Sequence, residues 1–102
     1  MSPTQRTLKH LRELGYTAEV VERWNPHARV RHDLFNIIDV LGVSETGVAA
    51  VQTTSAGNMK ARINKIAESD ILPLLIKLEW RVIVHGWRKN SKGRWELKEF
   101  EF

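Results

Sequence analysis

The sequence predicts a single α/β domain, residues 1–102, with a central mixed sheet flanked by helices in the order α-β-β-β-α-(α)-β-β. Two apolar runs, 35–43 and 48–53, have the content of neighbouring strands, and the polar turn SETG joins them. Residues 4–14 and 55–68 instead space their apolar side chains as helices do. Apolar residues on both faces of the first run indicate that helices cover both sides of the sheet.

Length and composition limit the class of protein. The chain has 102 residues, enough for one hydrophobic core, and 42% of them are hydrophobic. It has no cysteine, which excludes disulfides and thiolate zinc sites, and no apolar run near the ~20 residues of a membrane span. Without a signal-peptide pattern, we expect a cytoplasmic protein with no membrane partner. The net charge of +4 is compatible with a polyanionic partner such as DNA.

The first helix is predicted over residues 4–14. Ser2 or Thr4 can cap its start, Pro3 suits its first turn, and Gly15 ends it. Its leucines share one face, which is typical of packing on a core. Its basic residues form either a solvated surface or a surface for a phosphate backbone.

The β-branched and aromatic content of residues 16–24 predicts the first strand. Alternation places Glu22 on the more apolar face of this strand, together with Tyr16 and Trp24. A carboxylate on an apolar face is costly unless it is neutralised. Glu22 is therefore either paired with an arginine or part of a functional site.

Residues 25–32 are predicted to form a loop, because they open with Asn-Pro and are rich in arginine and histidine. The alternation of Arg29 and Arg31 with Val30 indicates that the end of this loop is already extended. Arg29 and Arg31 on this loop could hold a phosphate. The alternative is a solvated loop in which Arg31 pairs with Asp33. The histidines of this loop do not have the spacing of a zinc site.

The C-terminal half begins with helical segments. In the helix predicted over 55–68, Asn58, Arg62 and Lys65 surround an apolar stripe. These side chains face either solvent or a phosphate backbone. A further apolar helical segment covers residues 70–78, with a proline that its first turn tolerates.

Two strands, residues 80–87 and 94–102, are expected to end the chain as a hairpin. The turn RKNSKG between them is basic and contains a glycine. Neither face of the last strand is cleanly apolar, which indicates an edge of the sheet. Arg88 and Lys89 at this turn could contact a nucleic-acid backbone.

The most informative polar residue lies inside the first apolar run. Asp39 is expected within a strand, where a buried carboxylate costs several kcal/mol unless it is paired or bound to a cation. Hairpin pairing could place it beside Gln52, with Thr54 on the same side of the partner strand. Glu22 and Asp33 are the nearby carboxylates. Such oxygen ligands suit Mg²⁺ or Mn²⁺, and a metal of this kind can promote phosphodiester hydrolysis.

These residues also carry a resemblance to a known group of enzymes. An aspartate, a twelve-residue interval and then Gln52-Thr53-Thr54 at a strand end resemble the core motif of the PD-(D/E)XK nuclease superfamily. The runs VVERWN, R-x-DLFNIID and VQTTSAGNMKARINKI are similar to small phage or prophage-associated, archaeal-resolvase-like members. Here Q-x-T stands in place of E-x-K.

The resemblance implies a restriction-endonuclease-like fold and Mg²⁺-dependent hydrolysis of DNA. Asp39 matches the metal-binding aspartate of the motif. Gln52 stands where a Glu or Asp is usual, and it offers the metal an oxygen without a charge. Thr54 stands where a Lys is usual and has only a hydroxyl to orient a water. Glu22 would supply the further carboxylate that the superfamily often takes from its first helix.

The principal hypothesis is a metal-dependent DNA endonuclease in which Asp39, Gln52 and Glu22 hold Mg²⁺ or Mn²⁺. Thr54 or Asp33 then orders the attacking water or the metal's ligand shell. The basic residues that this hypothesis places on phosphates are Arg31, Arg62 and Lys65.

Two alternatives remain open. The first is a nuclease-like fold that binds DNA without cutting it, with a homodimer formed through an apolar strand or helix face. The replaced Glu and Lys of the motif motivate this alternative. The second assigns no function to Asp39 and neutralises it in an ion pair with Arg31 or Arg62.

Overall fold

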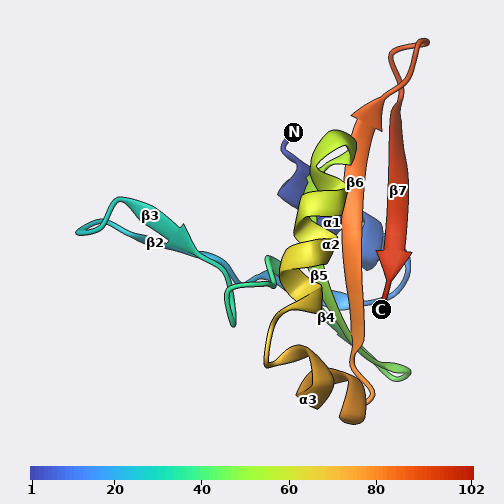
Figure 1. Ribbon diagram of the computed structural model, residues 1–102. Helices are drawn as coiled ribbons and strands as arrows, with labels where there is room; N and C mark the ends of the chain where they lie inside the picture. Colours follow the sequence, from blue (N-terminus) through green and yellow to red (C-terminus); the bar gives the residue numbers. More distant parts are fainter.

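A five-stranded mixed sheet in the order β1-β4-β5-β6-β7 forms the centre of the molecule (Figure 1). The computed structural model describes residues 1–102. The five strands of this sheet are Thr17–Val20 (β1), Val40–Ser44 (β4), Gly47–Ser55 (β5), Arg81–Lys89 (β6) and Trp95–Glu101 (β7). Only β5 and β6 run parallel, and the other neighbours are antiparallel. The predicted α/β class with a central mixed sheet is confirmed.

The helices predicted over 4–14 and 70–78 are found within two residues of those bounds, whereas the helix predicted over 55–68 begins only at Met59. Helix α1 spans Pro3–Glu13, and the Ser2 side chain accepts a hydrogen bond from the Gln5 backbone at its N-terminus. Gly15 follows it with φ +96°, a left-handed conformation that favours glycine. The crossover from β5 to β6 contains the 3₁₀ turn η1 and two helices. Their bounds are Ala56–Asn58 (η1), Met59–Ala67 (α2) and Leu72–Lys77 (α3).

The core lies on both faces of the sheet. Leu8 and Leu11 of α1 pack with Val51 and other apolar residues of one face. Ile66 of α2 and Leu75 of α3 pack against the other face. Both faces of β5 are therefore covered, which agrees with its continuous apolar sequence. None of the helices combines the length and the apolar character that crossing a membrane requires.

The single strand predicted over 16–24 is wrong. The loop predicted over 25–32 is confirmed at its turn, residues 26–29, and its end is extended from Val30 as expected. The first strand ends at Val20, and the chain then forms a separate antiparallel ribbon of β2, Arg23–Asn25, and β3, Val30–His32. The ribbon projects away from the main sheet (Figure 1). Asn25 closes its turn, because its Oδ1 accepts hydrogen bonds from the backbone N–H groups of two residues of the turn, at 3.0 and 3.2 Å. The order is therefore α-β-β-β-β-β-α-α-β-β, with two more strands than predicted.

The strand predicted over 35–43 begins only at Val40. Before it, Leu34 and Ile38 form an isolated bridge around a tight turn, in which Phe35 and Asn36 have φ of +55° and +65°. This turn buries Ile37 and Ile38 against the α2 and α3 face of the sheet. The apolar residues of this segment are therefore buried in a turn and not in an extended strand. Asp39 consequently lies immediately before β4 and not in the middle of a strand, and Glu22 lies beyond the end of β1.

Gly86→Ala is expected to lower the free energy of unfolding by about 1–3 kcal/mol, as overpacking of a close contact does. A Cβ added to Gly86 on β6 would overlap the Met59 side chain and lie 3.0 Å from the Ala56 Cα. The thioether can move aside, but the backbone of η1 cannot do so freely. Urea unfolding measures the change. Gly57→Ala is the control, because its Cβ meets no atom within 4 Å; equal losses in the two variants would contradict the expectation.

Candidate metal centre

Three carboxylates converge at the base of the β2–β3 ribbon. Glu22 and Asp33 flank the two ribbon strands, and Asp39 follows the tight turn that leads into β4. One oxygen from each lies within 4.8 Å of the other two. The register of the ribbon explains the meeting, because Arg23 pairs with His32 and so brings the flanking positions together.

Asp39 is the buried member of this acidic triad, with 4% of its surface exposed. Its Oδ2 accepts a hydrogen bond from Gln52 Nε2 at 2.6 Å and another from the Thr53 backbone N–H at 2.9 Å. The β4–β5 register, which pairs Val40 with Val51, continues directly into this contact. The predicted adjacency of Asp39 and Gln52 is confirmed.

The environment of Asp39 opposes its ionisation. Burial is the largest cause, and the neighbouring Asp33 adds to it through a side-chain hydrogen bond and charge repulsion. The hydrogen bonds from the Thr53 backbone and Gln52 act in the other direction. Together these effects raise the pKa of Asp39 from 3.8 to about 7. An ionised Asp39 therefore gains from any added positive charge.

The Gln52 amide lies between two of the carboxylates. Its Nε2 donates to Asp39 and, at 3.4 Å, to Asp33 Oδ2. Its Oε1 is buried and has no hydrogen-bond partner. A buried acceptor without a partner is costly, by about 1–3 kcal/mol.

The two outer carboxylates each have a basic neighbour. Arg31 Nη1 lies 3.0 Å from Glu22 Oε1, and Lys65 Nζ lies 4.0 Å from Asp33 Oδ2. The second alternative required an ion pair between Asp39 and Arg31 or Arg62. Asp39 forms neither pair. The alternative for the loop required an ion pair between Arg31 and Asp33. Arg31 instead pairs with Glu22.

These groups line a pocket of about 340 Å³ in which no lining residue is hydrophobic. The lining residues are Thr4, Glu22, Arg31, Asp33, Asp39, Gln52, Thr53, Arg62 and Lys65. Thr54 is buried but does not line the pocket, whereas the neighbouring Thr53 does. Thr4 and Thr53 were not predicted to belong to the site. Thr53 contacts Asp39 through its backbone N–H, which side-chain identity does not reveal.

Four other residues predicted to bind nucleic acid lie outside this pocket. Arg29 is in the turn of the ribbon, with φ +54°. Asn58 donates a hydrogen bond to Ser55 at 3.0 Å. Arg88 pairs with Glu96 at 3.2 Å, and Lys89 ends β6.

Comparison of the chain with family models, curated proteins and solved structures finds no match.

Proposed function

We propose that this protein is a metal-dependent endonuclease that hydrolyses phosphodiester bonds of DNA. The observation that carries the proposal is the acidic triad, Glu22, Asp33 and Asp39, in a polar pocket that Arg31, Arg62 and Lys65 also line. A divalent cation suits the carboxylates, and the cationic side chains suit a phosphate. The motif of the PD-(D/E)XK superfamily, which the sequence resembles, likewise combines metal-binding carboxylates with a basic residue.

We also infer a restriction-endonuclease-like fold. The support is a mixed sheet with α1 on one face and α2 on the other. Asp39 and Gln52, which match the two halves of the superfamily motif, lie at neighbouring positions of the β4–β5 hairpin.

The donor set of the pocket fits Mg²⁺ or Mn²⁺. All three carboxylates offer hard oxygen ligands, and oxygens are the ligands that these ions prefer. Gln52 Oε1, buried and without a partner, becomes a fourth oxygen when the two ends of its amide exchange. When bound, an ion of this class lowers the pKa of a coordinated water and stabilises charge on a phosphodiester.

The side chains around the pocket have separate roles in this proposal. Arg62 and Lys65 of α2 bind non-bridging phosphate oxygens and orient the scissile bond. Lys65 brings an ammonium into the pocket, although Thr54 offers none at the motif position. Asp33, which is less buried than Asp39, orders the attacking water. Thr54 takes no direct part, since it does not line the pocket.

The decisive experiment incubates the protein with supercoiled plasmid and with branched DNA, in Mg²⁺, in Mn²⁺ and in a chelator. We expect nicking or cleavage with a metal and none with the chelator. Intact DNA in both metals, with both substrates, would refute the nuclease proposal.

Binding of DNA without cleavage is the second candidate function. The Gln52 amide favours it, because its Nε2 occupies the oxygens of Asp39 and Asp33 that a metal needs. Metal-independent DNA binding without cleavage would distinguish it from the first. A homodimer remains part of this candidate, and α3 has an apolar surface that such a dimer could bury. The exposed residues of that surface are Leu74, Ile76 and Leu78.

The β2–β3 ribbon is the proposed DNA-binding arm for either function. Residues 23–32 contain three arginines and no acidic residue, and Trp24 is 56% exposed. A two-stranded ribbon has a width that the major groove of DNA admits. The ribbon also begins and ends at the acidic triad, so DNA held along it would pass the pocket.

Replacing both Arg23 and Arg29 with alanine is expected to weaken DNA binding equally across sequences. Two lost phosphate contacts reduce the slope of log K against log salt by about 2. Fluorescence anisotropy over a range of salt concentrations measures the slope. A double variant of Lys77 and Lys98, which are exposed on α3 and β7, is the charge-matched control. If both double variants change the slope equally, the ribbon has no special role.

A further inference from the structure

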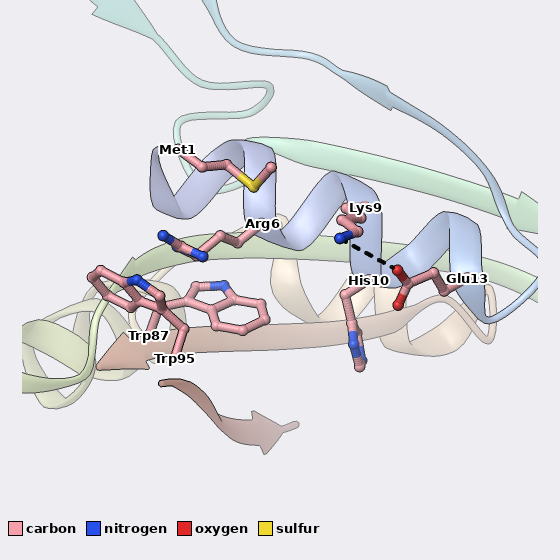
Figure 2. A pocket seen from close by; sticks show the side chains of 7 residues that line it. All are labelled: Met1, Arg6, Lys9, His10, Glu13, Trp87 and Trp95. Carbon is pink, nitrogen blue, oxygen red and sulfur yellow. Dashed lines mark ion pairs between the residues drawn. The ribbon is translucent and has the colours of Figure 1, made fainter. Parts of the chain in front are cut away.

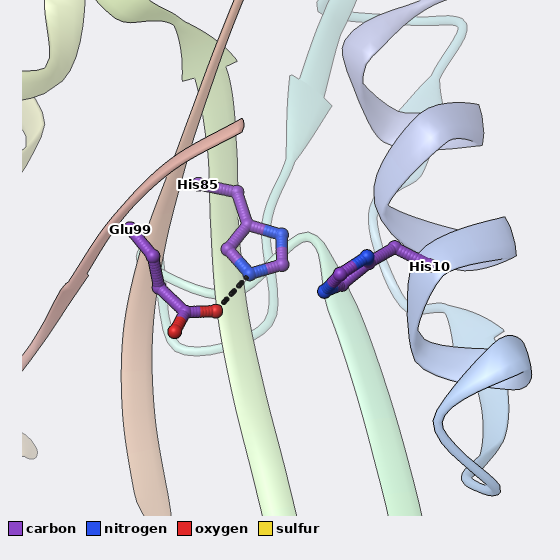
Figure 3. Close-up of side chains that lie close together, drawn as sticks. All are labelled: His10, His85 and Glu99. Atoms are coloured by element: carbon purple, nitrogen blue, oxygen red, sulfur yellow. Dashed lines mark hydrogen bonds and ion pairs between the residues drawn. The ribbon is translucent and has the colours of Figure 1, made fainter. Parts of the chain in front are cut away.

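A second cluster of ligating side chains shares no residue with the acidic pocket. It consists of His10 from α1, His85 from β6 and Glu99 from β7 (Figure 3). One ligand atom from each lies within 4.8 Å of the other two. His85 is fully buried, and Glu99 is its direct partner across the β6–β7 pair. Three separate elements of the fold therefore contribute one ligand each.

The Thr7 hydroxyl contacts one ring nitrogen of His85 and leaves the other nitrogen facing Glu99. The Thr7 hydroxyl donates its only proton to Thr53 Oγ1 at 3.0 Å and accepts from Trp87 Nε1 at 2.9 Å. His85 Nδ1 lies 3.0 Å from the same hydroxyl, and in the tautomer with its proton on Nδ1 it donates to Thr7. In a neutral imidazole, the lone pair is then on Nε2.

That lone pair faces another acceptor. His85 Nε2 lies 2.8 Å from Glu99 Oε2. Two acceptors at this distance need a positive centre between them, either a proton or a metal ion. A metal ion is such a positive centre, and the imidazole nitrogen and the carboxylate oxygen are both ligands that zinc accepts.

His10 supplies the third ligand. Its ring lies edge-on to His85, with the ring centroids 5.5 Å apart, and no side-chain hydrogen bond occupies its nitrogens. His10 also borders a cavity of about 290 Å³ that is lined by residues of α1, Trp87 and Trp95 (Figure 2). A ligand with a free lone pair therefore lies between the buried His85–Glu99 pair and an open space.

We propose that His10, His85 and Glu99 bind a zinc ion, with the fourth position left to water or a small ligand from the adjoining cavity. Two nitrogens and one carboxylate oxygen form a donor set that zinc accepts in three-ligand sites. The hydrogen bond from His85 Nδ1 to Thr7 orients the ring, as partners of zinc-bound histidines do.

Metal binding requires only small movements of the three side chains. Ligand atoms of a tetrahedral zinc ion lie about 3.3 Å apart, given metal–ligand distances of about 2.0–2.1 Å. The His85–Glu99 contact therefore opens slightly from 2.8 Å. The ligand nitrogen of His10, which lies within 4.8 Å of the other two ligand atoms, moves closer to them, since its ring is on the surface of α1 and can rotate. The ion would link α1 to the β6–β7 hairpin.

The test uses the whole chain after treatment with a chelator, titrated with Co²⁺ and then with Zn²⁺. We expect the visible absorption of a four- or five-coordinate site, which saturates at one Co²⁺ per chain and which Zn²⁺ abolishes, whether or not the acidic pocket also holds an ion. His10→Ala and Glu99→Gln should each lower zinc affinity at least about 10-fold, because even the partners of zinc ligands have effects of this size. Both positions are less buried than His85, so these variants keep the core intact.

Two controls separate this site from other metal-binding groups. His27→Ala removes a ribbon histidine, and Asp39→Asn alters the acidic pocket; both should keep the cobalt spectrum and the zinc affinity. In the Asp39→Asn background, zinc should raise the midpoint of thermal unfolding, and it should not do so when His10→Ala is added. The proposal is overturned if no cobalt spectrum develops, or if His10→Ala and Glu99→Gln bind zinc as tightly as the parent chain.

Discussion

Asp39→Asn is expected to lower metal-dependent DNA cleavage by about 10³-fold, since a bound metal supplies several kcal/mol of transition-state stabilisation. The carboxylate is the most buried oxygen donor of the acidic triad and the one closest to Gln52. Asparagine keeps its size and can still accept the hydrogen bond from the Thr53 backbone, so the pocket retains its shape. The initial rate of plasmid nicking in saturating Mg²⁺ measures the loss.

DNA affinity should be unchanged in the same variant, because the arginines of the ribbon are untouched. Asp70→Asn, an exposed carboxylate outside the pocket, is the matched control and should cleave at the parent rate. Cleavage by Asp39→Asn at the parent rate would exclude the acidic triad as the catalytic centre. Loss of both cleavage and DNA binding would instead indicate a wider disruption.

The same substitution is expected to stabilise the metal-free protein above pH 7. Folding raises the pKa of Asp39 from 3.8 to about 7, so the folded state binds more protons than the unfolded state between these values. Stability from this group is fully present below pH 3.8 and falls as pH rises to about 7. The largest loss is about 4 kcal/mol, from the free-energy equivalent of the pKa change. Asparagine has no charge to desolvate and avoids this loss.

Urea unfolding of both proteins between pH 4 and pH 8 tests the expectation. The stability difference between Asp39→Asn and the parent chain should grow with pH and level off above about 7. Added Mg²⁺ should restore stability to the parent chain at pH 8 and have less effect on the variant. A variant that is less stable than the parent at pH 8 would show that Asp39 mainly supports the fold.

Local sequence was sufficient for much of the fold. Ser2, Pro3 and Gly15 define the ends of α1 through contacts within a few residues, and these predictions are confirmed. The predicted turn before Gly47 and the β5 strand are confirmed for the same reason. The segment before Val40 was predicted wrongly, because a buried turn and a buried strand have similar apolar content.

The candidate site was predictable only where hairpin geometry determines it. Asp39 directly precedes β4, and a short turn joins β4 to β5. The register that brings Asp39 to Gln52 therefore follows from the local chain. Glu22 and Asp33 meet through the β2–β3 ribbon, and the pairing of its two strands was not predicted. Thr53 replaces Thr54 at the pocket, because the contact is made by backbone and not by side-chain type.

The sequence by itself determined the α/β class, the ends of α1 and the neighbouring positions of Asp39 and Gln52, because contacts between residues near in the chain encode them. Tertiary structure alone decided that Glu22 and Asp33 join Asp39 and that Lys65 reaches the same pocket. These meetings depend on how the ribbon leaves the sheet and how α2 packs on it. Long-range packing is a property of the whole core and leaves no pattern in any one segment.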